Sequence, residues 1–223
     1  ELSEGYFDPT VGPLVSAWGF HFKEGMTMTP EIVDSLRQLV GYKKVKIEEG
    51  RVVKENPNMT LDFNAVAQGY TTDMIGEFLL SKDVDNFLVD VGGEIMAKGN
   101  KANGDLWKVG IEKPADNKDD ARIVQEIIEL KDRSIVTSGN YRKYVEQDGK
   151  RYSHSLNPMT GYPSENNLLS ATIICDNTAW ADCLASICML VGMEKAIEII
   201  DTQDNVEAFF IYEENGEVFT MYN

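Results

Sequence analysis

The sequence predicts an α+β fold of mixed, largely antiparallel sheets with packed helices, and three observations support this. Runs of β-type residues dominate the middle of the chain, helical periodicity is confined to a few segments, and the chain ends on a strand-turn-strand pattern. Helices that interrupt antiparallel hairpins are typical of α+β proteins rather than of a doubly wound parallel sheet. The 223 residues contain no internal repeat and no Pro-, Ser- or Gly-rich linker, so we predict a single domain over residues 1–223.

Capping residues and apolar spacing predict four helices. The first begins at Thr29, a hydroxyl N-cap that is followed by Pro30, and ends at Gly41. The second begins at Asn64, and its apolar residues recur at helical spacing up to about residue 80: Val66, Tyr70, Met74, Ile75, Phe78 and Leu79. The last two helices are expected at residues 177–191 and 193–201.

Strands are expected where short β-type runs are bounded by turn residues. A first hairpin is predicted at residues 43–47 and 51–54, with a further strand at residues 59–63. A terminal hairpin turns at Asn215 and Gly216. The other expected strands cover residues 86–91, 94–98, 107–112, 123–130, 134–137, 141–146 and 168–175.

The charge of the chain argues against a nucleic-acid partner and suggests that any anionic ligand needs a positive group beside it. With 21 Lys and Arg against 37 Asp and Glu, the net charge of −16 repels phosphate backbones, so we expect no nucleic-acid partner. An anionic ligand would need a bound cation or backbone N–H groups nearby. No apolar run is long enough to span a bilayer, and Cys175, Cys183 and Cys188 are expected to be buried free thiols.

Asp182 is the first candidate for chemistry, because it is an acid in an otherwise apolar helix. A carboxylate in apolar surroundings must be paired, protonated or bound to a metal. Ser186 lies one turn further along the same face, so a carboxylate and a hydroxyl can converge on one hard cation. The alternative is that Asp182 is an exposed acid of the first helical turn, where it interacts with the helix dipole.

Two other segments are candidates. At residues 62–70 a strand leads into a helix whose N-terminal N–H groups and small residues suit a phosphate, and whose carbonyls suit a metal; alternatively, Asp62 only caps the helix. In the loop at residues 152–163, His154 is either a general base or ligand donor, since imidazole titrates near neutral pH, or a surface residue.

Seven motifs, taken in order, resemble those of the ApbE family, the FAD:protein FMN transferases. They lie between residues 5 and 186 and read G-Y-F-D-P-T-V-G-P-L, D-F-N-A-V-A-Q-G-Y, V-D-V-G-G-E-I, W-K-V-G-I-E-K-P, S-I-V-T-S-G-N-Y, H-S-L-N-P-M-T-G and A-D-C-L-A-S. Each motif is modest alone, but seven in family order are hard to obtain by chance. The resemblance implies an ApbE-like, T-fold-related α+β architecture.

The resemblance also implies an activity. Such an enzyme would use Mg²⁺ to transfer FMN from FAD to a Thr or Ser hydroxyl of a target flavoprotein, with release of AMP. Hydrolysis of FAD to FMN and AMP, and FAD binding without turnover, remain alternatives. A requirement for magnesium agrees with the acidic composition of the chain. The ion would neutralise a diphosphate, for which the chain has few cationic side chains.

Residue roles follow from the motifs that match. The resemblance implies Ala65, through its carbonyl, Asp182 and Ser186 as magnesium ligands, with His154 as the base and Asp182 as the second catalytic candidate. FAD contacts are implied for Tyr6, Phe7, Asp8, Asp62, Gln68, His154 and Ser155. Gln68 stands where many members have Lys, so one phosphate-directed charge is absent.

Members of the family carry an additional N-terminal segment before the motif at residue 5. The sequence begins just before this motif, and unless a separate chain supplies the segment we expect an exposed sheet edge or apolar patch and weakened FAD binding. The resemblance further suggests export to the periplasm or the outer face of the cytoplasmic membrane, with a lipid anchor on the precursor.

Overall fold

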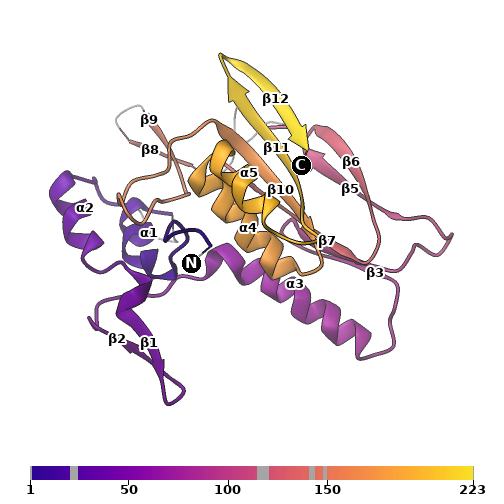
Figure 1. Cartoon of the computed structure of the whole chain (residues 1–223), viewed down its shortest axis with the longest axis horizontal. Coiled ribbons are helices and arrows are strands. Elements are labelled where there is room, and N and C mark those ends of the chain that lie inside the picture. The colour runs from indigo at the N-terminus through magenta and orange to yellow at the C-terminus, as the bar shows by residue number, and fades with distance from the viewer. Residues whose placement is uncertain (1, 21–24, 115–120, 141–143, 148–149, 223) are drawn as a thin grey trace. The chain divides into compact units, whose positions relative to one another are not determined.

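A computed structural model describes residues 2–20, 25–114, 121–140, 144–147 and 150–222 of the chain. The residue contacts group into two compact units, and Figure 1 labels their helices and strands. Unit 1 comprises residues 1–63 and 143–165, and unit 2 comprises residues 64–142 and 166–223. The single domain expected over residues 1–223 stays a prediction, and each unit is described on its own. Within the described ranges, no helix combines the length and the hydropathy that a membrane span requires.

Unit 2 is built on a six-stranded sheet with the order β12-β11-β10-β7-β4-β3, in which all neighbours pair antiparallel. The strands are β3 (Phe87–Val91), β4 (Glu94–Lys98), β7 (Arg133–Gly139), β10 (Leu168–Cys175), β11 (Glu207–Glu214) and β12 (Glu217–Tyr222). Strand β10 is buried along almost its whole length, as expected for a central strand covered on both faces. The sheet therefore confirms the antiparallel α+β fold.

Three helices pack on this sheet: α3 (Asn64–Leu80), α4 (Thr178–Val191) and α5 (Met193–Asp201). Helix α4 contacts β10, β7 and both other helices, and Figure 1 shows it between α3 and the strands. A separate hairpin, β5 (Trp107–Glu112) and β6 (Val124–Leu130), adds to a core cluster of Ile95, Ala97, Ile111, Leu130, Ile135, Ile174, Phe209 and Ile211. The apolar residues of α4 are thus held in the centre of unit 2.

Helix α3 packs its small and polar residues and exposes its large apolar ones. Its buried residues are Gly69, Thr72, Asp73 and Gly76. Its exposed apolar residues include Tyr70 (60%), Met74 (45%), Ile75 (39%) and Phe78 (60%). The apolar spacing that predicts the helix therefore marks its exposed face.

Unit 1 consists of short elements around a small core. They are η1 (Pro9–Val11), α1 (Gly12–Trp18), α2 (Pro30–Arg37), η2 (Tyr42–Lys44), β1 (Val45–Glu48), β2 (Arg51–Lys54), β8 (Tyr144–Gln147) and β9 (Lys150–Ser153). The core contains Leu14, Ala17, Trp18, Met28, Val33, Val40 and Leu156. The indole N–H of Trp18 donates to the carbonyl of Gly161 at 3.0 Å, so α1 holds the loop that follows β9.

The start of α2 and both predicted hairpin turns are confirmed. The hydroxyl of Thr29 accepts the N–H of Ile32 at 3.4 Å, although α2 ends at Arg37, before Gly41. The turns at residues 49–50 and 215–216 adopt positive φ at all four residues, as type I′ hairpins require.

Some expected elements differ from the structure. The strand predicted at residues 59–63 is wrong, because the N–H groups of Met59 and Asp62 donate to the carbonyls of Asn56 and Pro9 instead of a partner strand. Residues 141–143 of the strand predicted at 141–146 lie outside the described residues, and β8 begins at Tyr144. Elements η1, α1, η2 and β9 were not expected, because Gly, Pro and turn residues obscure such short segments, and the strand predicted from residue 43 begins at Val45.

Candidate functional site

Asp182 lies in α4 with only 5% of its surface exposed. Its Oδ2 accepts a hydrogen bond from the backbone N–H of Gly69, on α3, at 3.1 Å. The alternative of an exposed acid in the first helical turn is therefore wrong. Asp182 is a buried carboxylate held at the contact between two helices.

The same hydrogen bond joins Asp182 to the first part of α3, four residues after Ala65. In a regular helix the N–H of Gly69 points toward the carbonyl of residue i−4, which is Ala65. We therefore expect the Ala65 carbonyl to lie on the side of α3 that Asp182 approaches. A Cβ built on Gly69 would lie 2.6 Å from the carbonyl oxygen of Thr178, so only glycine permits this approach.

Ser186 lies on α4 one turn after Asp182 and is half-buried. Asp182, Ser186 and the Ala65 carbonyl would together offer three different oxygen donors to an ion. Within the described ranges, no group of three or more His, Cys, Asp or Glu residues could hold a metal ion. A single carboxylate with neutral oxygens resembles sites for Mg²⁺, which is usually bound by one or two carboxylates, waters and substrate phosphates. The residues present therefore fit magnesium better than zinc, which prefers Cys and His.

Unit 2, which holds Asp182, also carries most of the negative charge of the chain. Its sequence has 11 Lys and Arg against 24 Asp and Glu, a difference of −13, whereas unit 1 has 10 against 13. Burial, and secondly the negative charge of Asp182, raises the pKa of the neighbouring Cys183 thiol to about 11. An anionic ligand near Asp182 would therefore need a compensating cation.

A second buried acid, Asp73 on α3, was missed by the sequence reasoning. It is 6% exposed, and its two carboxylate oxygens accept the N–H groups of Thr178 and Ala179, each at 2.9 Å. A signal was available: Asp73 falls at helical spacing with the small residues Gly69 and Gly76.

Gln68 connects α3 to the turn between β3 and β4. Its side-chain amide donates to the carbonyl of Val91 at 3.2 Å. The next residue, Gly92, has a positive φ, and a Cβ there would collide with the Gln68 amide nitrogen. The Gly-Gly turn in V-D-V-G-G-E-I thus permits close approach by the Gln68 side chain.

In unit 1, the Tyr6-Phe7-Asp8 turn is fixed by its own hydrogen bonds. The N–H groups of Tyr6 and Phe7 donate to the carbonyl and hydroxyl of Ser3, at 2.9 and 3.0 Å. Asp8 is 8% exposed; its Oδ1 accepts from the N–H and hydroxyl of Thr10, and its Oδ2 from the N–H of Tyr42 at 2.8 Å. The Asp8 side chain therefore holds the turn in place, which leaves ligand contacts to the residues around it.

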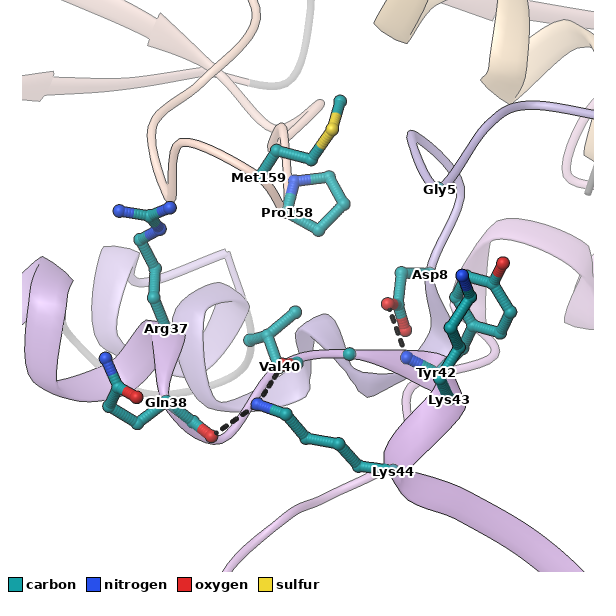
Figure 2. Close-up of a pocket in the computed structure, with 11 residues that line it drawn as sticks. Gly5, Asp8, Arg37, Gln38, Val40, Tyr42, Lys43, Lys44, Pro158 and Met159 are labelled. Atoms are coloured by element: carbon teal, nitrogen blue, oxygen red, sulfur yellow. Dashed lines mark hydrogen bonds between the residues drawn. The ribbon is translucent and has the colours of Figure 1, made fainter.

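A cavity of about 520 Å³ adjoins this turn, and Figure 2 shows its lining residues. The cavity has Pro158 and Met159 on one side and the segment containing Val40 and Tyr42 on the other. Three cations also line it: Arg37, Lys43 and Lys44. The Lys44 amine is engaged, since it donates to the carbonyls of Gln38 and Val40 at 2.9 and 2.8 Å. Of the predicted site residues, only Asp8 lines this cavity.

His154 begins the loop that contains Pro158, and its side chain is half-buried. Its ring lies 6.5 Å from the ring of Phe20 in an edge-on arrangement. The carbonyl of Ser155 accepts the N–H of Ser164 at 2.7 Å, and the side chain of Asn157 accepts the N–H of Met159 at 2.9 Å. These bonds order the loop around His154.

The predicted site residues fall in both units. The proposed metal ligands Ala65, Asp182 and Ser186, together with Gln68, belong to unit 2. The others, Tyr6, Phe7, Asp8, Asp62, His154 and Ser155, belong to unit 1. In unit 2, Asp182 lies against the N-terminal part of α3. In unit 1, the backbone N–H of Asp62 donates to the carbonyl of Pro9 at 2.6 Å.

Comparison with known proteins finds the same relatives by sequence and by structure. The FAD:protein FMN transferase of Vibrio cholerae is 39% identical over 202 residues, which are 90% of this chain and 60% of that protein. The FAD:protein FMN transferase of Haemophilus influenzae is 33% identical, over 98% of this chain and 64% of that protein. The chain thus spans a little over three fifths of the length of these relatives.

Solved structures of flavin transferases have the same fold. The flavin transferase ApbE from Vibrio cholerae superposes with a TM-score of 0.87 at 34% identity, over 99% of this chain and 70% of that chain. The ApbE protein from Thermotoga maritima gives a TM-score of 0.85 at 28% identity, over 98% and 70%. The model of the ApbE family matches residues 1–210, across both units. On this match and these relatives, the chain belongs to the ApbE family.

Proposed function

We propose that this chain transfers FMN from FAD to a Thr or Ser hydroxyl of a target flavoprotein, in a magnesium-dependent reaction that releases AMP. The curated relatives named FAD:protein FMN transferase support the reaction class. The observation that carries the assignment is the buried Asp182 carboxylate, held against the N–H of Gly69 at the start of α3.

Magnesium would be held by the carboxylate of Asp182, the hydroxyl of Ser186 and the carbonyl of Ala65. When bound, the ion would neutralise the FAD diphosphate and stabilise charge on the transferred phosphoryl group and on the leaving AMP. The acidic composition of unit 2 supports this role, because its side chains supply few cations for a diphosphate.

The remaining residues either contact FAD or accept a proton during the reaction. We assign FAD contacts to Tyr6, Phe7, Asp62, Gln68, His154 and Ser155, and to Asp8 the role of holding the turn that carries Tyr6 and Phe7. The hydroxyl oxygen of the acceptor forms a bond to the FMN phosphorus, and the bond from that phosphorus to the AMP oxygen breaks. A ring nitrogen of His154 accepts the hydroxyl proton, because Asp182 cannot serve both as a tight metal ligand and as the base.

Product analysis tests the proposal. The chain is mixed with FAD, magnesium and an acceptor that carries the target Thr, and with the same acceptor in which Thr is replaced by Val. AMP release with covalent flavin fluorescence on a denaturing gel, for the Thr acceptor alone, is the expected result. AMP release without an acceptor would instead establish FAD hydrolysis, and intact FAD after prolonged incubation would establish binding without turnover.

The place of action is proposed on the family resemblance. We infer export to the periplasm or the outer face of the cytoplasmic membrane, with a lipid anchor on the precursor. Fractionation of cells that express the native gene tests this, since recovery of the protein with the cytoplasmic fraction would contradict it.

A further inference from the structure

Asp73 connects α3 to the N-terminus of α4. Its carboxylate is buried, and each oxygen accepts one N–H group: Oδ1 from Thr178 and Oδ2 from Ala179, at 2.9 Å each. These N–H groups belong to the first turn of α4, where backbone donors have no partner within the helix. The first turn of α4 therefore depends on a side chain from the neighbouring helix.

A second carboxylate spans the same contact in the opposite direction. Asp182, on α4, accepts the N–H of Gly69, on α3, at 3.1 Å. Gly69 and Asp73 are four residues apart on α3, and Thr178 and Asp182 are four residues apart on α4. The two carboxylates thus lie one helical turn apart, and their three hydrogen bonds fix both the separation and the register of the helices.

The partner helix is itself anchored to the sheet. The hydroxyls of Thr178 and Ser134, on β7, are hydrogen-bonded at 2.7 Å, and both residues are buried. The side chain of Asn177 separately caps α4 by accepting the N–H of Trp180 at 2.8 Å. Loss of the Asp73 side chain would therefore leave α4 capped and anchored to the sheet. It would remove one of the two carboxylates whose hydrogen bonds align α3 with α4.

We propose that Asp73 is a positioning residue for the cation site, because its bonds to Thr178 and Ala179 set the register of α3, which carries Ala65, against α4, which carries Asp182. It acts through Thr178 and Ala179 and does not touch the ion. This role rests on the proposed function for the identity of the ion, whereas the alignment of the two helices stands on the hydrogen bonds alone.

The test compares Asp73→Ala and Asp73→Asn with Asn177→Ala, a control that removes a cap from the same helix without touching α3. Amide hydrogen exchange by NMR reports on the Gly69 N–H, and urea unfolding reports on overall stability. Titration calorimetry with Mg²⁺, without FAD or acceptor, reports on the cation site.

The variants are compared under conditions that give them the same free energy of unfolding. We then expect the amide proton of Gly69 to exchange at least about tenfold faster in both Asp73 variants than in Asn177→Ala. Magnesium affinity should fall about 10- to 100-fold, as for other residues that orient metal ligands. Asp73→Asn keeps the shape and one acceptor oxygen, so it serves where Asp73→Ala does not fold.

Three outcomes count against the inference or its premise. Gly69 exchange equal to that of Asn177→Ala would overturn the alignment role, whatever the magnesium result. Faster Gly69 exchange with unchanged magnesium affinity would make Asp73 a structural residue only. A wild-type chain that binds no magnesium would overturn the proposed function and the cation part of the role, while the exchange data would still decide the alignment.

Discussion

The carboxylate of Asp182 accepts a hydrogen bond from the backbone N–H of Gly69, 3.1 Å away on another helix. This contact requires α3 and α4 to approach until backbone meets backbone, which the absence of a Cβ at Gly69 allows. An acid in an otherwise apolar helix thereby gains a hydrogen-bond donor, and it is held against the first part of α3, the helix that carries Ala65.

Gly69→Ala should separate the two helices. The new Cβ would lie 2.6 Å from the Thr178 carbonyl oxygen and 2.9 Å from Ala179 Cα, both backbone atoms that cannot move aside. We expect a loss of about 1–3 kcal/mol in the free energy of unfolding, measured with urea.

Gly76→Ala is the matched control in the same helix. There the nearest atom is the sulfur of Met96, at the end of a flexible side chain that can rotate away. The alanine also favours the helix by about 1 kcal/mol over glycine, so the net change should be small. Equal destabilisation by the two substitutions would show that the close approach at Gly69 is not special.

The exposed face of α3 gives a second prediction. Tyr70 is 60% exposed, whereas Leu184 of α4 is fully buried at 0%. Tyr70→Gln should change the free energy of unfolding by no more than about 0.5 kcal/mol. Leu184→Ala should cost about 2–5 kcal/mol. A cost above about 2 kcal/mol for Tyr70→Gln would mean that this face is packed in the folded chain.

The same helix shows how far the sequence predicts the fold. Periodicity and capping predict α3, α4 and α5 almost to the residue, since local signals define helix ends. Periodicity does not predict which face of α3 is buried. That face is set by close packing, of Gly69 against α4 and of Gly76 against Met96 and Phe87 of the sheet, which favours glycine over bulky apolar residues.

The site was predictable to the extent that its signals are local. Asp182 and Ser186 stand out because polar oxygens one turn apart interrupt an apolar helix. Ala65 has no such signal, because a backbone carbonyl is not encoded by a residue type, and only the family resemblance indicated it. Asp73 shares helical spacing with Gly69 and Gly76, but this spacing does not identify its partners, Thr178 and Ala179, which are more than 100 residues away in the chain.

Two thiols predict a pH effect: Cys188 is buried as expected, whereas Cys183, also expected to be buried, is only half-buried. Burial raises the pKa of Cys188 to about 12, and burial together with the charge of Asp182 raises that of Cys183 to about 11. Both thiols should react slowly with iodoacetamide at pH 8 in the folded chain and readily in urea, as mass spectrometry can measure. Fast labelling of Cys188 in the folded chain would contradict its burial.

Stability should fall at alkaline pH for the same reason. Unfolded thiols ionise near pH 8.5, whereas the folded Cys183 and Cys188 hold their protons to about pH 11 and 12. Above about pH 8.5 the folded state therefore binds more protons than the unfolded state. The two thiols contribute fully to the free energy of unfolding below about pH 8.5, and this contribution is lost as the pH rises. Urea midpoints for the wild type and a Cys183→Ala, Cys188→Ala variant should differ in slope between pH 8 and 10.

Gln68→Lys should strengthen FAD binding. The substitution restores a cation where many family members carry Lys, at a position that now donates to the Val91 carbonyl. A gain of about 1.4 kcal/mol would lower the FAD dissociation constant about tenfold, and the gain should shrink at high salt. Gln68→Met is the control, because it removes the bond to Val91 without adding charge. Equal FAD affinity in the two variants would place residue 68 away from the phosphates.

The most direct test of the cation site is the magnesium dependence of FAD binding, followed by flavin fluorescence in the wild type, Asp182→Asn and Glu198→Gln. Both substitutions remove one negative charge from unit 2, but Glu198 is an exposed residue of α5, whereas an Asn at position 182 can still accept the Gly69 N–H. We predict that magnesium tightens FAD binding at least about tenfold in the wild type and in Glu198→Gln, and that Asp182→Asn abolishes this effect. Equal magnesium dependence in all three proteins would contradict the account.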